Sequence, residues 1–383
     1  METVAPFSEI VDEIKEAGGE TFKLCYQCGK CDAVCPWNRV ITFSMRKVIR
    51  EAAFGLTDIE GDSFWRCTTC GRCMLQCPRQ VRQIELGVSL RRLATQYQVF
   101  PASVKPVRTM SGSLAGDGNP LNEDRQKRGD WARGLPVKPF AAGMEILYFV
   151  GCYLSYDARL KKVAVATARI LDKAGVDFGI LGARESCCGE SIRKTGDEEV
   201  FRRLATDNIK TFIDSGVKRI LVSSPHCYHT LKNEYPEFMV HFEIVHLAQY
   251  LEELILAGRL TVGGVYARKV TYHDPCYLGR HNNIYEEPRT LLGRVAGLEL
   301  VEMADNRADS LCCGGGGGRI WMETAKAERF SDLRVKQAQT VGAEVLATAC
   351  PYCITNFEES RLSLDPDNQL EIKDLAEIIS DVI

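Results

Sequence analysis

The spacing of apolar residues changes at about residue 144. Beyond it, short apolar runs such as "EILYFV" and "VKRILVSS" alternate with longer stretches of helical composition such as "LKKVAVATARILDKAG". Apolar runs of strand length that alternate with helical segments are typical of α/β domains with mainly parallel sheets. We therefore expect strands and helices to alternate from residue 144 to residue 383.

The same order of runs occurs twice, which indicates an internal duplication. "KVTYHD", "EEPRTLLGRVAG", "LELVEM" and "AEVLATA" repeat the earlier pattern, and cysteines mark equivalent places at a nearly constant offset of 124 to 126 residues. By this offset Ser224 stands opposite Cys350. The equivalent cysteines are Cys152 and Cys276, Cys187-Cys188 and Cys312-Cys313, and Cys227 and Cys353.

The pattern predicts four segments. The repeats are residues 144–262 and 263–383, and residues 101–143 carry repeated Pro and Gly without a sustained apolar period, which predicts a linker. Within residues 1–100, "SMRKVIREAAFG" has helical composition and ends at a glycine. The expected fold class is α+β multidomain: a helical module followed by two duplicated α/β domains related by a pseudo-twofold axis.

Two cysteine motifs dominate residues 1–100. "CYQCGKCDAVCP" and "CTTCGRCMLQCP" both fit C-x2-C-x2-C-x3-C-P, the spacing of two-cluster ferredoxins, in which the fourth cysteine ligates the other cluster. Pairs of the form C-x2-C also bind zinc, but two complete motifs with proline at the same place favour iron-sulfur. We expect two cubane 4Fe-4S clusters, one on Cys25, Cys28, Cys31 and Cys77 and the other on Cys67, Cys70, Cys73 and Cys35.

Composition narrows the class of protein. The net charge is -3 and there is no long basic block, which excludes a nucleic-acid-binding footprint. No apolar run approaches the ~18 residues that span a membrane, and the first residues lack a secretory pattern. We expect a cytoplasmic protein, in which the 17 cysteines are metal ligands because cytosolic thiols are kept reduced.

The repeats resemble a known family. "CYL…CCG…SPHC" and "CYL…CCGGGGG…CPYC" are similar to the paired CCG domains of heterodisulfide reductase iron-sulfur subunits, and the whole chain resembles the D-type subunit, in which a ferredoxin module is fused to them. Iron-sulfur subunits of glycolate oxidase and of anaerobic glycerol-3-phosphate dehydrogenase are related. The resemblance implies a noncubane 4Fe-4S cluster, at which a disulfide is cleaved in the reductases, on Cys276, Cys312, Cys313, Cys350 and Cys353.

The first CCG domain departs from this five-cysteine pattern. It offers Cys152, Cys187, Cys188 and Cys227, with Ser224 in the fifth place. Soft thiolates suit iron-sulfur clusters and zinc alike, so three interpretations stay open: a noncubane cluster with the serine oxygen or a water on one iron, an ordinary cubane, or a closed zinc site. We favour iron-sulfur because four of the five ligand positions are kept.

These features predict a function in electron transfer. No G-x-G-x-x-G follows a strand, so hydride chemistry belongs on another subunit. The expected partner is a flavoprotein, an electron-transfer flavoprotein, or a quinone or cytochrome subunit through which the chain would associate with a membrane. The alternative is a catalytic subunit that reduces or forms a (hetero)disulfide at the C-terminal cluster, with a thiol or disulfide as substrate. The sequence leaves open whether this chain is itself an enzyme.

Weaker candidates lie beside the cysteines. For the nearby histidines and aspartate a core or surface role is favoured over ligation, and an arginine and a histidine after "CYLG" are candidates for substrate or proton contact. Gly314–Gly318 lacks the Lys-Ser or Lys-Thr of a phosphate loop, so we expect these glycines to let the backbone pass close to a cluster. The side chains concerned are His226, His229, His273 and Asp274, and then Arg280 and His281.

Overall fold

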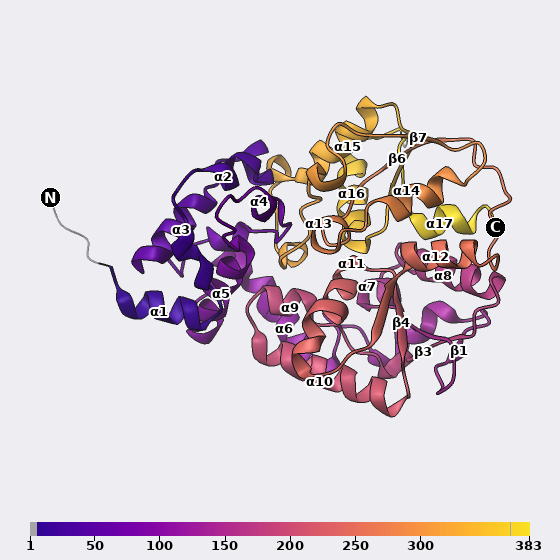
Figure 1. The fold of residues 1–383 in the computed structure, drawn as a ribbon, viewed down its shortest axis with the longest axis horizontal. Helices are drawn as coiled ribbons and strands as arrows, with labels where there is room; N and C mark the ends of the chain where they lie inside the picture. The colour runs from indigo at the N-terminus through magenta and orange to yellow at the C-terminus, as the bar shows by residue number, and fades with distance from the viewer. Residues whose placement is uncertain (1–5, 368) are drawn as a thin grey trace. The chain divides into compact units, whose positions relative to one another are not determined.

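The computed structural model describes residues 6–367 and 369–383 and divides the chain into two compact units (Figure 1). Unit 1 contains the described residues up to Gly112 together with the segments 191–201 and 314–330. Unit 2 contains residues 113–190, 202–313 and 331–383. Each of the two sequence repeats therefore contributes one segment to the unit that carries the ferredoxin motifs.

Unit 1 is helical, as expected. The helix α3 shows how the sequence sets its bounds: the Ser44 hydroxyl accepts a hydrogen bond from the Lys47 N–H at its start, and Gly55 ends it with a φ of 65°. Val48, Ile49 and Ala52 form its buried face. The α-helices are α1 Ser8–Glu16, α2 Lys30–Val34, α3 Met45–Phe54, α4 Arg72–Leu75 and α5 Gln83–Gln96, and 3-10 turns include Phe64–Arg66 and Arg319–Trp321.

The segments 191–201 and 314–330 are held in unit 1 by a buried arginine of α5. The Arg91 guanidinium donates hydrogen bonds to the carbonyl oxygens of Lys194 at 2.9 Å and Gly317 at 2.8 Å. It also donates to the carbonyls of Phe64 and Cys67. One side chain thus joins both inserted segments to the backbone of the second ferredoxin motif.

Unit 2 contains two parallel sheets with the same topology. The first has the strand order β1-β3-β2-β4-β5 and the second β7-β6-β8-β9, so the second repeats the first without its edge strand. The strands are β1 Lys138–Pro139, β2 Ile146–Phe149, β3 Phe178–Ile180, β4 Arg219–Val222, β5 Glu243–His246, β6 Lys269–Tyr272, β7 Glu299–Val301, β8 Val345–Thr348 and β9 Glu371–Asp374. The duplication predicted from the cysteine offset is confirmed.

The helices of unit 2 are related by the same symmetry. Helix α8 packs on α17 of the other repeat, and α12 packs on α14, which are the reciprocal contacts that a pseudo-twofold axis requires. Both α12 and α17 begin with a capping box, at His246 and Asp374. The helices of the two repeats are α7 Cys152–Tyr156, α8 Lys161–Lys173, α9 Glu190–Lys194, α10 Glu198–Asp214, α11 Pro225–His229, α12 Leu247–Leu256, α13 Gly279–Asn282, α14 Glu286–Gly293, α15 Phe330–Thr340, α16 Pro351–Leu364 and α17 Leu375–Ser380. Of these, the parts of α9 and α10 within residues 191–201 and the first residue of α15 belong to unit 1.

The predicted linker, residues 101–143, is more structured than its composition indicates. It contains the helix α6 Lys105–Asp117 and a 3-10 segment at Arg125–Ala132. Val107, Met110 and Leu114 of α6 are buried at helical spacing, although Pro106 and several Gly and Ser residues weaken the helical pattern. The segment is therefore a packed part of the fold rather than a plain connection.

Among the residues that the structure describes, no helix is both long and apolar enough to cross a membrane.

Candidate metal centres

The two ferredoxin loops share an unusual backbone. Gln27 and Thr69, each directly before the second cysteine of its motif, have positive φ of 65° and 51°, and the glycines that follow that cysteine, Gly29 and Gly71, have φ of 82° and 80°. Left-handed residues on both sides of the second cysteine turn the backbone sharply, which lets the three cysteines of a loop face one point. The same residue pattern therefore builds the same loop twice.

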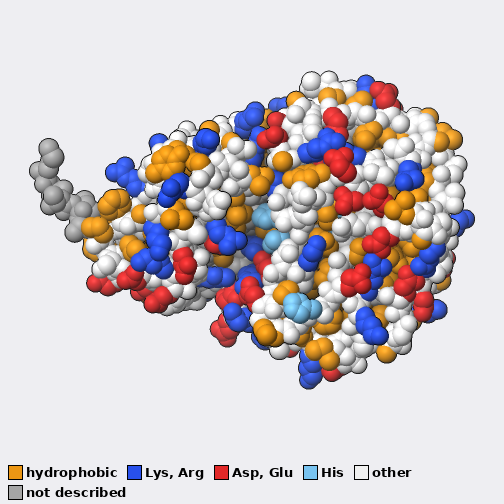
Figure 2. All heavy atoms as spheres, viewed as in Figure 1, with side chains coloured by type: hydrophobic (Ala, Val, Ile, Leu, Met, Phe, Trp, Pro, Cys, Tyr) orange, Lys and Arg blue, Asp and Glu red, His pale blue; other side chains and the backbone are white. Residues whose placement is uncertain are grey.

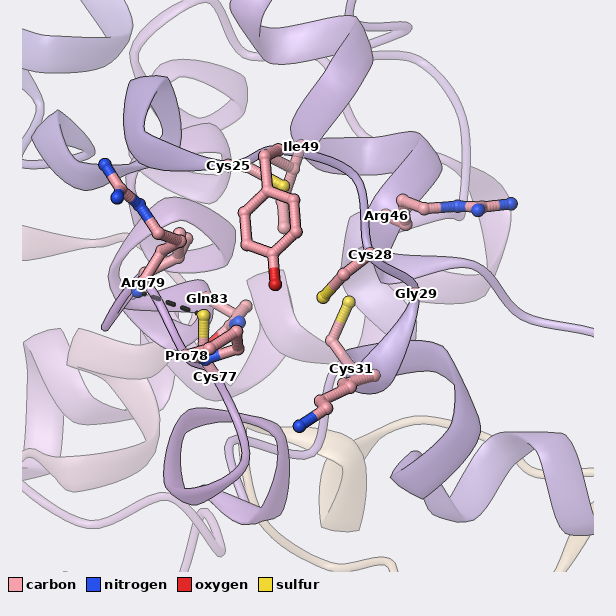
Figure 3. A pocket seen from close by; sticks show the side chains of 13 residues that line it. Cys25, Cys28, Gly29, Cys31, Arg46, Ile49, Cys77, Pro78, Arg79 and Gln83 are labelled. Carbon is pink, nitrogen blue, oxygen red and sulfur yellow. Dashed lines mark hydrogen bonds between the residues drawn. The ribbon is translucent and has the colours of Figure 1, made fainter.

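Four cysteines line one pocket in unit 1. Cys25, Cys28 and Cys31 come from the first motif, and Cys77 is the fourth cysteine of the second motif. Figure 3 shows the sulfurs of Cys28 and Cys31 directed toward one another, with Cys25 and Cys77 on other sides of the same space. This is the crossed set that the sequence predicts for the first cluster.

A second pocket is lined by Cys35, Cys67, Cys70 and Cys73, the other crossed set, and also by Cys31. Burial, followed by the charge of Asp32, raises the pKa of Cys31 to about 12. Burial also raises the pKa of Cys35 and Cys73. Thiols gathered in a buried space are costly to ionise without a cation, and a bound metal supplies that cation. The residues present therefore fit two metal clusters.

Backbone amides and arginines complete these sites. The Gln27 N–H donates to Cys25 Sγ at 3.4 Å, and the Val81 N–H donates to Cys77 Sγ at 3.3 Å. Near the second cavity, the Arg66 and Arg319 guanidinium groups lie 5.6 and 5.5 Å from the centre of the Trp37 ring. Such donors and cations stabilise an anionic cluster.

The first CCG site gathers at the carboxyl ends of two neighbouring strands. Strands β2 and β4 are paired, and Cys152 follows β2 while Ser224 and Cys227 follow β4. The side chains of Cys152 and Cys187, of Cys188 and Cys227, and of Cys227 and Ser224 lie close enough to shift the pKa of these thiols. The structure thus brings together all five residues that the sequence assigns to this site.

Arg128 is a residue of this site that sequence reasoning missed. It comes from the predicted linker, and its Nη2 lies 3.5 Å from Cys152 Sγ and 2.6 Å from Glu185 Oε1. The Glu185 carboxylate also accepts the N–H groups of Val150 and Gly151 at 3.0 and 2.9 Å. Both charged side chains are 2% exposed. No local pattern in the sequence marks a lone arginine in a Pro- and Gly-rich stretch as a neighbour of a ligand.

The second CCG site follows β6 and β8, which are also paired. Cys313 and Cys353 have their sulfurs 3.2 Å apart, and the side chains of Cys276 and Cys312 and of Cys350 and Cys353 lie close enough to shift the pKa of these thiols. Each of these five cysteines is buried. The five residues that the family resemblance assigns to a noncubane cluster therefore converge, and every one of them offers a thiol.

Two histidines face this second site. His226, from the first repeat, lies close enough to Cys350 of the second for each to shift the pKa of the other, and its Nδ1 lies 3.2 Å from Glu190 Oε1. Its ring lies between Tyr277 and Tyr352, with centroid distances of 4.2 and 4.3 Å. His273 offers a nitrogen within 4.8 Å of the sulfurs of Cys313 and Cys353. Both histidines stood as weaker candidates in the sequence.

The protonation of these groups follows from their neighbours. Burial opposes the charge of His226, but the Glu190 carboxylate and Cys350 raise its pKa to about 10. Burial also disfavours the Cys350 thiolate, yet hydrogen bonds from Cys353 and His226 lower its pKa to about 5. Arg334 donates to His273 Nδ1 at 3.0 Å, which leaves the proton of the neutral ring on Nε2.

The remaining candidates have structural partners. Asp274 forms an ion pair with Arg289 at 2.6 Å, and Arg280 donates to the carbonyls of Ala308 and Ser310. His281 stacks on Tyr277 at 4.4 Å, and its other ring neighbour is His229 at 5.1 Å. These contacts account for the positions of the four side chains without a ligand.

The glycine run has a role that the sequence did not indicate. A Cβ on Gly317 would lie 2.5 Å from the carbonyl oxygen of Cys67, and one on Gly316 would collide with the carbonyl oxygen of Thr68. The glycines do let the backbone approach a predicted cluster site closely, but it is the second ferredoxin site, in unit 1.

Comparison with known families agrees with this arrangement. Residues 21–81 match the 4Fe-4S dicluster domain, and residues 146–232 and 270–358 each match the cysteine-rich domain called CCG. Such domains hold iron-sulfur clusters.

Three relatives share much of the chain. It is 36% identical over 277 residues to a probable iron-sulfur-binding oxidoreductase, FadF, of Bacillus subtilis (70% of this chain, 39% of the relative). It is 38% identical over 242 residues to an EtfAB:quinone oxidoreductase of Syntrophomonas wolfei (61% and 34%). It is 32% identical over 271 residues to the D-type subunit of the dihydromethanophenazine:CoB--CoM heterodisulfide reductase of Methanosarcina barkeri (69% and 65%). The chain thus spans between a third and two thirds of the length of these relatives.

Proposed function

Because the chain belongs to the proteins that join a 4Fe-4S dicluster domain to two cysteine-rich CCG domains, we propose that it is the electron-transfer subunit of a heterodisulfide-reductase-like complex. The observation that supports this proposal is that eight of the 17 cysteines line two pockets of unit 1 and the other nine lie in the two CCG domains, none of them in a disulfide. Iron-sulfur clusters accept and release single electrons. The chain's own residues supply thiolates, N–H donors and buried cations to them.

We assign the ligands as the sequence does. Two cubane clusters would be held by the crossed ferredoxin sets, and a noncubane cluster by the five cysteines of the second CCG domain. In the first CCG domain, Cys152, Cys187, Cys188 and Cys227 with Ser224 would hold a further cluster, with zinc as the alternative. Arg128 would balance the negative charge there.

The partners would be a flavoprotein on one side and a further redox subunit on the other. The names of two relatives, an iron-sulfur-binding oxidoreductase and an EtfAB:quinone oxidoreductase, support electron transfer in preference to disulfide conversion on this chain. Through a quinone-linked or cytochrome partner the complex would associate with a membrane.

The test is the metal and sulfide content of the anaerobically purified chain, followed by a redox titration. We expect roughly 16 irons per chain and no zinc, with several one-electron steps. Roughly 12 irons and one zinc would assign zinc to the first CCG site. A chain that holds no acid-labile sulfide, or whose metal cannot be reduced by dithionite, would contradict the proposed function.

A further inference from the structure

The first ferredoxin site reaches the surface of unit 1. Of the 17 cysteines, Cys28 alone is exposed, while the cysteines of the second ferredoxin site and of both CCG sites are buried or half-buried. Electrons tunnel efficiently only over short distances, so a protein that exchanges electrons with this chain must bring its redox centre close to a cluster edge. Cys28 marks the place where the chain offers such an edge.

The residues around Cys28 are basic and apolar. Lys30, Arg46 and Arg79 line the same cavity as the four cysteines, and all three side chains are exposed. Figure 3 shows Arg46 and Arg79 on opposite sides of the cysteines. Tyr26, which also lines the cavity, is 60% exposed. We name these four residues with Cys28 the Cys28 rim.

The rim has little negative charge of its own. The cavity lining includes no carboxylate. The nearby Asp32 is partly neutralised, because it accepts hydrogen bonds from the Ser44 hydroxyl at 2.7 Å and the Arg46 N–H at 2.9 Å, and its Oδ2 lies 3.8 Å from Arg46 Nε. Within the described part of the chain, neither Lys30 nor Arg79 forms an ion pair. Their charges are therefore available to a second molecule.

The surface of unit 1 is divided by charge. Figure 2 shows Lys and Arg side chains over the region where Figure 1 places α2 and α3, and Asp and Glu side chains toward the end occupied by α1. The acidic residues of α1 include Glu9, Asp12 and Glu13. Cations next to a redox site raise the encounter rate with an anionic partner, and an exposed tyrosine supplies apolar contact area.

We propose that the Cys28 rim is the docking surface for an acidic one-electron carrier protein. This inference rests on the proposed function. In the exchange, the reduced carrier gives up one electron and a cluster of the chain takes it up, and no covalent bond forms or breaks. Lys30 and Arg79 orient the carrier through charge, and Tyr26 contacts its surface beside the redox centre.

The test compares the full cluster-loaded chain with two double charge reversals, Lys30→Glu/Arg79→Glu and the control Lys162→Glu/Lys210→Glu, which reverses two exposed lysines of unit 2. The probe is an acidic flavodoxin in its hydroquinone state, mixed anaerobically in a stopped-flow instrument. We expect the rim variant to be reduced about tenfold more slowly at low salt and to lose most of the salt dependence. The control variant should stay within about twofold of the wild type.

A second readout does not depend on electron transfer. Zero-length carbodiimide cross-linking should join Lys30 to a carboxylate of flavodoxin, and the cross-link should be lost at high salt. Equal reduction rates for the rim variant and the control would overturn the proposal. So would wild-type binding to anionic phosphatidylglycerol vesicles that the rim variant loses, because the rim would then face a membrane.

Dithionite separates this proposal from the proposed function. If dithionite reduces the clusters of every variant while flavodoxin does not distinguish the variants, the docking surface is wrong and the electron-transfer function stands. If dithionite reduces no cluster in the wild type, the proposed function fails first.

Discussion

Arg91 Nη1 lies 2.8 Å from the carbonyl oxygen of Gly317, 226 residues further along the chain. The same guanidinium donates to the carbonyl of Cys67 at 2.7 Å, so a cysteine assigned to the second cluster and the glycine run after Cys313 share one hydrogen-bond donor. Arg91 is fully buried, and every hydrogen bond described for its terminal nitrogens goes to a carbonyl oxygen. An anionic cluster on the Cys67 set would balance its charge.

We therefore predict that Arg91→Gln lowers the reduction potential of the second ferredoxin cluster. Loss of one nearby positive charge disfavours the more negative reduced state, by on the order of 50 to 100 mV at an effective dielectric constant of about 20. The measurement is a redox titration followed by electron paramagnetic resonance. The exposed Arg82→Gln is the control, and an unchanged potential in a folded Arg91→Gln chain would show that Arg91 acts only on packing.

The glycine run predicts a steric effect on the same cluster. Gly316→Ala places a methyl group against the Thr68 carbonyl, and forcing the backbone apart should cost about 1–3 kcal/mol. We expect a lower melting temperature and loss of iron from the ferredoxin unit. Gly112→Ala is the matched control, because nothing lies within 4 Å of a Cβ there. Equal iron content in the two variants would argue against close packing at Gly316.

The ion pair beside the first CCG site should be sensitive to the loss of one partner. Arg128→Met leaves Glu185 as a buried carboxylate without its cation, which should lower the free energy of unfolding by about 3–5 kcal/mol. Chemical unfolding followed by circular dichroism measures the loss. Arg133→Met removes a pair whose arginine is 79% exposed, so it should cost less than about 1 kcal/mol. A similar loss of unfolding free energy in the two variants would contradict the stabilising role of the buried Arg128–Glu185 ion pair.

Ser224→Cys restores the fifth thiol of the first CCG site. Ser224 is buried and lies close enough to Cys227 to lower the pKa of its thiol, and by the repeat offset the new sulfur would stand where Cys350 stands in the other repeat. Because thiolate binds iron of a cluster better than an alcohol does, we expect slower loss of iron to a chelator, by severalfold. Ser360→Cys adds a buried thiol about two turns beyond Cys353 and serves as control. One zinc per chain and no iron at this site in both proteins would favour the structural zinc site.

The buried His246 predicts a pH dependence of stability. Burial lowers its pKa to about 3, below the ~6.5 of an unfolded chain, so the unfolded state binds the extra proton between these values. The contribution of His246 to the free energy of unfolding is therefore complete above pH 6.5. It declines as the pH falls, and about 2 kcal/mol of it is lost at pH 5. His246→Asn keeps an N-cap residue for α12. In urea titrations at pH 5, 6 and 7, the free energy of unfolding of this variant should depend less on pH than that of the wild type. The same pH dependence of the free energy of unfolding in the two proteins would contradict this account.

Local sequence patterns were enough to predict the repeated topology of unit 2 and the position of cysteines after the strands. Side-chain periodicity reports on a strand and its faces, and a fixed offset reports on a duplication. The offset also places His226 opposite Tyr352, and the structure shows these two rings in contact between the repeats, tilted by 36° with their centroids 4.3 Å apart. Equivalent positions of two repeats touch only where they lie beside the pseudo-twofold axis. The sequence shows which positions are equivalent, but it does not show where the axis passes.

Other features could not be predicted because they depend on distant parts of the chain. Arg128 meets Cys152 and Glu185 only after the sheet has formed, and nothing near it in the sequence marks it as different from its neighbours. In the same way, Lys194 and Gly317 matter because their carbonyl oxygens accept hydrogen bonds from Arg91, which lies 103 and 226 residues away from them in the sequence. The sequence did not predict helix α6, because Pro106 and the glycines of this segment weaken the helical pattern of its buried apolar residues.

The two inserted segments also fix an order of events during synthesis. The ferredoxin motifs leave the ribosome first, but the packing around Cys67 needs Lys194 and Gly317, which lie far downstream. The nascent chain must therefore pass residue 330 before unit 1 can close. Unit 1 can thus be completed only when most of unit 2 has also been translated, and the second ferredoxin cluster can be sealed from solvent only after both CCG cysteine pairs have been made.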